Sequence, residues 1–297
     1  MISITYLVAL FNAFLAIVML ISNWKLNKHI LSFSLYLLVI SFTSVLYDTI
    51  INGGSAQLLM LLVGYSGPLF FLVGPLFYFF IRGLVNEHHE FTDKDLIHLV
   101  PFFLNLIVMM PYLFKPVEFK LDMAERSLQN LSFYMNSKLV FLPVWFNTLI
   151  RIASMMFYIL WSIVVLHRAY RGKIKVLEGA LRKQYVSNYR WLNLISIASL
   201  LLVFMHLGLT MYFRFDPEMD FISRVENDNL FLVSVIINSI FPLIILFNPG
   251  ILFGFPTSQV LNPMMKELLV NAEGKYSYSV LEAADKAKTY NDYFDGL

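Results

Sequence analysis

The sequence predicts an all-α fold, a polytopic membrane bundle of seven transmembrane helices. A helix needs about 20 predominantly apolar residues to cross a bilayer, and it satisfies its own backbone polar groups in hydrocarbon. Hydrophobic residues make up 58% of the chain and charged residues 14%. Seven apolar stretches have this length or come close to it: Ile4–Ile21, Ile30–Ile51, Leu58–Ile81, Leu96–Leu113, Trp145–Leu166, Leu192–Phe213 and Leu230–Phe247.

The lysines and arginines predict that the N-terminus lies outside and the C-terminus inside (N-out/C-in). With this orientation fifteen of the 22 fall on inside segments, six fall on outside loops, and Arg151 lies within a span. Membrane proteins keep an excess of Lys and Arg on the cytoplasmic side. The first apolar stretch has no cation before it and no small-residue cleavage site after it, so we expect a retained helix rather than a signal peptide.

The segments between and after the spans divide the chain into two parts. Residues 1–250 are expected to form the bundle, and residues 251–297 a cytoplasmic connector marked by prolines and a short helix. Proline removes a backbone donor and disfavours helix at the residue before it. The cation-rich stretch His167–Arg190 is expected to extend its two neighbouring helices along anionic lipid headgroups. Phe114–Val144 and Arg214–Asn229 are expected to be outside loops.

The third span contains a short repeat, Gly67-Pro68-Leu69-Phe70 and Gly74-Pro75-Leu76-Phe77. The two copies are seven residues apart, close to two helical turns, so both Gly-Pro pairs lie on nearly the same face. Prolines bend a spanning helix, and glycines allow a neighbour to approach closely. Two interpretations stay open: packing around a bent helix, or a hinge at Gly67, Pro68, Gly74 and Pro75 that moves when a ligand binds.

Three ionisable residues lie inside predicted spans, where each marks a functional site by default. Asp48, Arg151 and His206 come from three different helices and sit at a similar depth below the outer surface. This predicts one water-accessible pocket that opens outward, with Asp48 and Arg151 as a partly buried pair.

Helical periodicity adds further polar residues to the predicted pocket. Residues three or four apart share one side of a helix, and the resulting ligand-binding hypothesis comprises Asp48, Asn147, Arg151, Ser154, Tyr158 and His206. Small polar residues also join helices by hydrogen bonds, and Arg151 can extend its side chain to the headgroups, so both alternatives stay open. Asn12, Asn105 and Asn238 are expected to bond between helices.

Several classes of function are not expected. The chain has no cysteine, which removes thiolate chemistry and cysteine-ligated metals, and a net charge of +2 without a dense basic block predicts no nucleic-acid contact by this chain. Glu87-His88-His89-Glu90 carries ligand-type side chains, but zinc needs three or four convergent ligands and no distant partner set is visible. No catalytic motif is visible. We expect neither an enzyme nor a cofactor or metal site.

Four stretches resemble a known family. They are Gly74–Arg82, Asp95–Phe102, Tyr189–Leu192 and Asn248–Pro256. Together they resemble the membrane-embedded N-terminal region of Bacteroidetes-type membrane-bound AraC-family transcription regulators, and Lys275–Tyr293 is similar to the stretch before the DNA-binding domain of that family. The DNA-binding domain itself is not present in this chain. The resemblance implies a multi-pass protein of the bacterial inner membrane that acts in signal transduction.

The leading hypothesis is therefore a sensory module, the input domain of an AraC-type regulator, for a periplasmic or outer-leaflet ligand. The expected partners are the lipid bilayer, an unknown small molecule or lipid, and other membrane subunits or a second copy of the chain. A small seven-helix transporter and a non-catalytic subunit of a larger membrane complex remain as alternatives. No internal repeat supports the transporter.

Overall fold

The computed structural model describes residues 3–24, 28–52, 54–85, 91–138, 142–176, 179–215 and 228–247. All the regular elements in these ranges are helices, which confirms the all-α prediction for this part of the chain. In chain order they are α1 (Ile4–Asn23), α2 (Lys28–Ile51), α3 (Ala56–Val85), the 3₁₀ helix η1 (Asp93–Leu99), α4 (Val100–Leu113), α5 (Val117–Gln129), α6 (Leu131–Asn136), α7 (Val144–Val176), α8 (Gly179–Phe215) and α10 (Asp228–Phe247).

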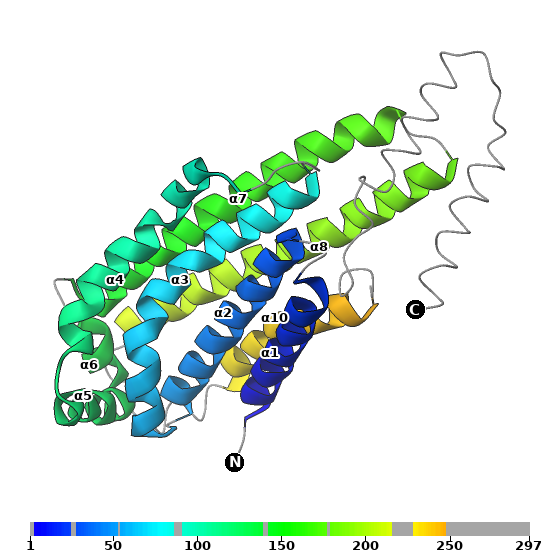
Figure 1. Ribbon diagram of the computed structural model, residues 1–297. Coiled ribbons are helices and arrows are strands. Elements are labelled where there is room, and N and C mark those ends of the chain that lie inside the picture. Colours follow the sequence, from blue (N-terminus) through cyan, green and yellow to red (C-terminus); the bar gives the residue numbers. More distant parts are fainter. Residues whose placement is uncertain are drawn as a thin grey trace, which may run out of the picture.

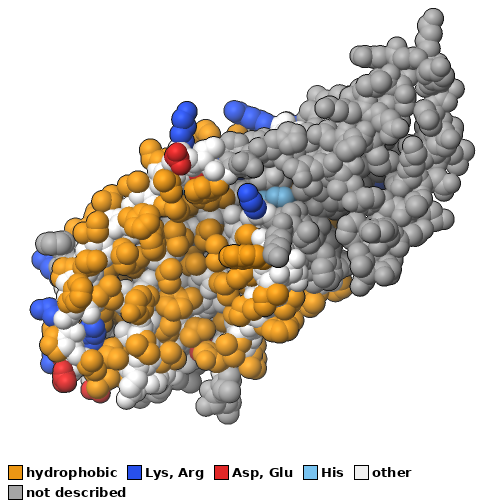
Figure 2. Space-filling view, in the orientation of Figure 1, with side chains coloured by type: hydrophobic (Ala, Val, Ile, Leu, Met, Phe, Trp, Pro, Cys, Tyr) orange, Lys and Arg blue, Asp and Glu red, His pale blue; other side chains and the backbone are white. Residues whose placement is uncertain are grey.

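Six segments within the described ranges are long and apolar enough to span a membrane. They are Ile4–Asn23, Lys28–Ile50, Ala56–Val85, Asp93–Leu113, Val144–Arg171 and Tyr185–Tyr212. The predicted seventh span falls on α10, where the apolar helix found is the shorter Val235–Phe247. Figure 2 shows a broad band of hydrophobic side chains on one face of the molecule, with charged side chains gathered toward its ends. This is the pattern of a multi-pass membrane protein.

Six helices form a closed ring. Each helix packs against the next in the order α1, α2, α3, α7, α8 and α10, and α10 packs back against α1. α4 lies outside the ring against α3, while α5 and α6 lie together at one end of the bundle (Figure 1). At the opposite end α7 and α8 project beyond their neighbours (Figure 1). α7 is 33 residues long and α8 is 37, so both exceed the 30 Å or so of a hydrocarbon core.

Aromatic side chains fill the interior of the ring. The largest fully buried ones come from α2, α3 and α10, and they include Phe33, Tyr36, Phe77, Phe80 and Phe241. Phe33 stacks on Phe80 with ring centroids 4.4 Å apart, and the Tyr36 hydroxyl donates a hydrogen bond of 2.7 Å to Ser199 on α8. The ring is thus a packed core held by aromatic contacts.

α3 runs as one helix through both Gly-Pro pairs. A methyl group on Gly67 would lie 3.1 Å from Oδ1 of Asn105 on α4, and one on Gly74 would lie 2.8 Å from the Tyr158 ring on α7. The two glycines therefore allow α4 and α7 to approach α3 closely. This accounts for both glycines by packing, and the hinge stays a prediction.

Two predicted loops contain helices. The stretch Phe114–Val144 was expected to be an outside loop, yet it holds α5 and α6. The prediction from apolar length did not detect these two helices, because neither has an apolar run of spanning length. Within His167–Arg190 the expected helical extension is confirmed, since α7 continues to Val176 and α8 begins at Gly179.

Several predictions lie outside the described residues. They are the connector and short helix at 251–297, residues 248–250 at the end of the predicted bundle, the Glu-His-His-Glu segment at 87–90, and residues 216–227 of the predicted outside loop.

Candidate functional site

Arg151 is a buried cation about two turns into α7. Only 9% of its surface is exposed. Its Nε donates to the Asn147 carbonyl oxygen at 3.2 Å, and Nη2 donates to the Thr148 hydroxyl at 3.1 Å. Both acceptors belong to the turn just before Arg151, because helical side chains lean toward the N-terminus of their helix. The side chain is therefore held by its own helix.

A small cavity of about 30 Å³ lies beside the Arg151 side chain. Its volume is enough for one or two water molecules. Its walls come from four helices, and α6 supplies Tyr134 and Met135 to them. The lining residues are Leu46, Tyr47, Ile50, Ser66, Phe70, Tyr134, Met135, Thr148 and Arg151. The cavity thus lies where α2, α3 and α7 meet α6.

His206 of α8 packs against two residues of the cavity wall. Its ring centroid is 5.0 Å from that of Tyr47 and 5.2 Å from that of Phe70, both in edge-on geometry. Nδ1 lies 2.7 Å from the Leu202 carbonyl oxygen. Because a carbonyl only accepts, Nδ1 carries a proton. The structure thus brings Arg151 and His206 into one neighbourhood, joined by Tyr47 and Phe70.

The charge of Arg151 has no carboxylate partner among the described residues, since no ion pair of Arg151 is found there. Insertion scales give a cost of about 2.5–3.5 kcal/mol for such a cation at the centre of a spanning helix, which is the upper limit for Arg151 nearer the helix end. The Phe70 ring, 5.9 Å from Cζ, offsets part of this cost. Burial raises the pKa of Tyr134 above its ordinary value, and the nearby Arg151 charge lowers it by less. Tyr134 is therefore neutral at pH 7 and does not balance Arg151.

The predicted pair of Asp48 and Arg151 is wrong. Asp48 Oδ1 accepts hydrogen bonds from the Ser3 hydroxyl and from Nδ2 of Asn52, the latter at 2.7 Å. Asp48 therefore joins the start of α1 to the end of α2. Adjacent helical residues point about 100° apart, so Tyr47 faces the cavity while Asp48 faces α1.

The remaining predicted pocket residues are divided between places. Asn147 accepts a hydrogen bond of 3.1 Å from Asn105 and so joins α7 to α4. Ser154 is half-buried on α7, and Tyr158 belongs to a second cluster further along the same helix. Of the six candidates, the structure brings the side chains of Arg151 and His206 into one neighbourhood, and Asn147 contacts Arg151 through its backbone oxygen.

The asparagines predicted to bond between helices do so. Asn12 Nδ2 donates to the Asn238 backbone oxygen at 3.0 Å, and Ser44 donates to the Asn238 side chain at 3.0 Å. Asn105 bonds across to α7. These bonds tie α10 to α1 and α2, and α4 to α7.

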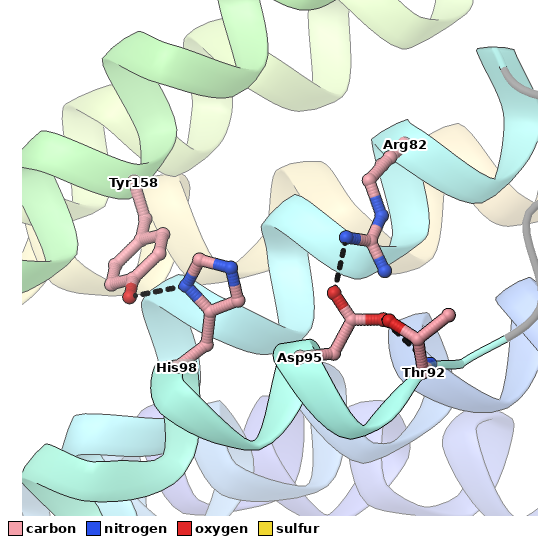
Figure 3. Close-up of polar contacts among 5 residues, drawn as sticks. All are labelled: Arg82, Thr92, Asp95, His98 and Tyr158. Carbon is pink, nitrogen blue, oxygen red and sulfur yellow. Dashed lines mark hydrogen bonds and ion pairs between the residues drawn. The ribbon is translucent and has the colours of Figure 1, made fainter.

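A second polar cluster connects α3 to η1. Arg82 Nη1 lies 2.5 Å from Oδ1 of Asp95. Oδ2 of the same carboxylate accepts from the backbone N–H and the hydroxyl of Thr92, at 2.8 Å and 3.1 Å. Figure 3 shows both oxygens engaged. The guanidinium also lies over the Phe79 ring, 5.1 Å from its centroid.

His98 extends this second cluster to α7. Its Nδ1 lies 2.9 Å from the Tyr158 hydroxyl (Figure 3). The sequence interpretation missed the cluster, although Thr92 followed by Asp95 three residues later is a helix-start signal. Gly74–Arg82 and Asp95–Phe102, two stretches that carry the family resemblance, are thus neighbours in the fold.

The described residues contain no group of three or more His, Cys, Asp or Glu that could hold a metal ion. Comparisons with family models, with curated proteins and with solved structures found no match to this chain.

Proposed function

We propose that this chain is a membrane sensory and signal-transducing module, the input region of an AraC-type transcription regulator in the bacterial inner membrane. The observation that carries the proposal is the cavity at Arg151. Its walls come from α2, α3, α6 and α7, so a bound molecule would contact four helices at once. Such a molecule shifts the population of helix arrangements if it binds one arrangement more tightly than another.

The long helices α7 and α8 supply a path from the cavity to the other end of the bundle. Near that end Tyr170 of α7 stacks on Tyr189 of α8 with centroids 5.6 Å apart. His167 Nδ1 lies 2.5 Å from the Tyr189 hydroxyl. These contacts hold the two helices together, so a displacement of α7 at the cavity is passed on to the α7–α8 projection. In the proposed N-out/C-in orientation, with α10 as the seventh span, that projection is cytoplasmic.

The sensory function is favoured over the transporter because the ring interior is filled with aromatic side chains. Phe33, Tyr36, Phe77 and Phe80 are each 0% exposed. A transporter needs a binding site near the middle of the membrane that opens to each side in turn. The Arg151 cavity lies instead at the end of the bundle where α6 lies.

The test is a comparison of transcripts in the native host. A deletion strain and an Arg151→Gln strain should change the same set of transcripts relative to the parent. Arg214→Gln is the control, because Arg214 lies over the Trp145 ring, 5.3 Å from its centroid, and does not line the cavity. Immunoblots of the membrane fraction establish equal protein levels. Transcripts that are the same in the parent and the deletion strain across growth conditions would contradict the proposal.

A further inference from the structure

Building on this sensory function, we propose that the signal is an alkyl carboxylate, a monoanion with an apolar chain, received by the Arg151 guanidinium. The hydrogen bonds, the charge and the cavity walls support this ligand class independently of one another.

The guanidinium has unused donors. Arginine carries five N–H groups, and the described residues accept from two of them, one on Nε and one on Nη2. Nη1 has no hydrogen-bond partner in this part of the chain, and Arg151 lines the cavity. A planar guanidinium matches the two oxygens of a carboxylate with two parallel hydrogen bonds. The remaining N–H groups of Arg151 are therefore available to donate hydrogen bonds to a carboxylate in the cavity.

The single positive charge of the site is balanced by a ligand that carries one negative charge. Arg151 is the one charged residue among those that line the cavity. A buried cation is stabilised by an anion that also fills its free donors. A monoanion makes the site neutral, whereas a dianion such as a dicarboxylate leaves an uncompensated negative charge.

The walls fit an apolar substituent. Leu46, Ile50, Phe70 and Met135 contribute apolar side chains to the lining. Apolar walls with a few converging polar groups are the usual form of a small-molecule site. The cavity of about 30 Å³ has room for the carboxylate group, so the proposed alkyl chain lies between the wall side chains, which must move apart to admit it. The carboxylate can thus come from a short soluble acid or from a fatty acid in the bilayer.

The experiment measures the thermal unfolding midpoint of the full chain, purified in an uncharged detergent, as a function of added butyrate. A ligand that binds only the folded state stabilises it by RT ln(1 + [L]/Kd), so the midpoint rises steadily with the ligand concentration. Butyramide, which has the same shape without the charge, is the matched control compound. Octanoate against octanamide forms a second arm. A larger effect of octanoate identifies a bilayer-derived acid, and a larger effect of butyrate identifies a soluble one.

Variants assign the effect to the site. Arg151→Gln should abolish the shift, and Arg151→Lys should weaken binding by roughly ten- to hundredfold because the ammonium loses the two-pronged geometry. Met135→Trp keeps the charge and fills the cavity, so it should also abolish the shift even if Arg151→Gln does not fold. Arg214→Gln should keep the full shift.

Three results would overturn the carboxylate site. They are no shift with either acid, an equal shift with the amides, and a shift that survives both Arg151→Gln and Met135→Trp. Butyrate or octanoate binding at Arg151 with unchanged transcripts in the Arg151→Gln strain would keep the carboxylate site and remove the sensory function. Altered transcripts without carboxylate binding would do the reverse.

Discussion

The guanidinium of Arg151 lies 5.9 Å from the centre of the Phe70 ring. On α8, His206 meets the same ring edge-on at 5.2 Å. Phe70 of α3 therefore connects α7 to α8 beside the cavity. A cation over an aromatic face gains about 0.5–2 kcal/mol. This gain is less than the cost of burying an unpaired arginine, so binding of an anion would stabilise the site further.

Asp48 and Arg151 are expected to contribute independently to stability. Asp48 is bonded to Ser3 and Asn52, and Arg151 to Thr148 and Asn147, so the two share no partner. The unfolding free energies of Asp48→Asn, Arg151→Gln and the double variant should be additive within about 0.5 kcal/mol. A coupling of 1 kcal/mol or so would show that the two residues do meet.

The sequence predicts the depth of Asp48 and Arg151 but not their partners. Apolar length fixes how far each residue lies along its helix, and charge favours pairing two opposite signs at the same depth. Pairing also depends on the direction in which each side chain points around its helix, and this follows from packing between helices. Tyr47, next to Asp48, faces the cavity instead.

Breaking the Arg82–Asp95 ion pair is expected to destabilise the protein far more than breaking the exposed Arg126–Asp122 pair. The first pair has side chains only 12% and 5% exposed, and the second 61% and 52%. Asp95→Asn should destabilise the protein by about 3 kcal/mol, because it leaves Arg82 buried without a counter-charge. Asp122→Asn should change stability by no more than about 0.5 kcal/mol.

Chemical denaturation of both single variants measures this difference, and the double variant Arg82→Gln/Asp95→Asn serves as a check. The double variant should be less destabilised than the sum of its singles. Similar effects of Asp95→Asn and Asp122→Asn would mean that the buried pair contributes nothing special.

Gly74→Ala should destabilise the bundle, whereas Gly208→Ala should not. A methyl group at Gly74 would lie 2.8 Å from Cδ2 and 3.0 Å from Cβ of Tyr158, while one at Gly208 meets nothing within 4 Å. The first change must push α3 and α7 apart, at about 1–3 kcal/mol. Thermal unfolding of the two variants under the same conditions measures the difference. A Gly74→Ala variant as stable as the native chain would show that α7 is not packed closely on α3.

Most of the helices could be predicted because a long apolar run has few alternatives in a membrane. α1, α2, α3, α7 and α8 fall on predicted spans for this reason. The short helices α5 and α6 could not be predicted by this signal, since they depend on caps and packing rather than on apolar length. α6 begins after Asn130, whose side chain accepts from the Phe133 N–H at 2.9 Å. Asn130 can be recognised in the sequence as a helix cap, but the role of α6 in the cavity wall follows only from the tertiary fold.

The proposed orientation places the α2–α3 turn outside and the α7–α8 projection inside. Because the chain has no cysteine, single cysteines can be introduced at the exposed positions Ser55 and Lys183. An impermeant thiol reagent applied to cells with a permeabilised outer membrane should label Ser55→Cys and leave Lys183→Cys unlabelled until the inner membrane is opened. Labelling of Lys183→Cys alone would reverse the orientation.

The most direct test asks whether a ligand at the Arg151 cavity changes the distance between helices at the opposite end of the bundle. Nitroxide labels on Trp24→Cys after α1 and Arg171→Cys on α7, both exposed, report the distance between these helices at the end opposite α6. Added butyrate or octanoate should change the distance distribution from pulsed electron spin resonance, and the same variant carrying Arg151→Gln should show no change. Distributions that stay identical with and without the acids, in both backgrounds, would contradict a carboxylate sensor at Arg151.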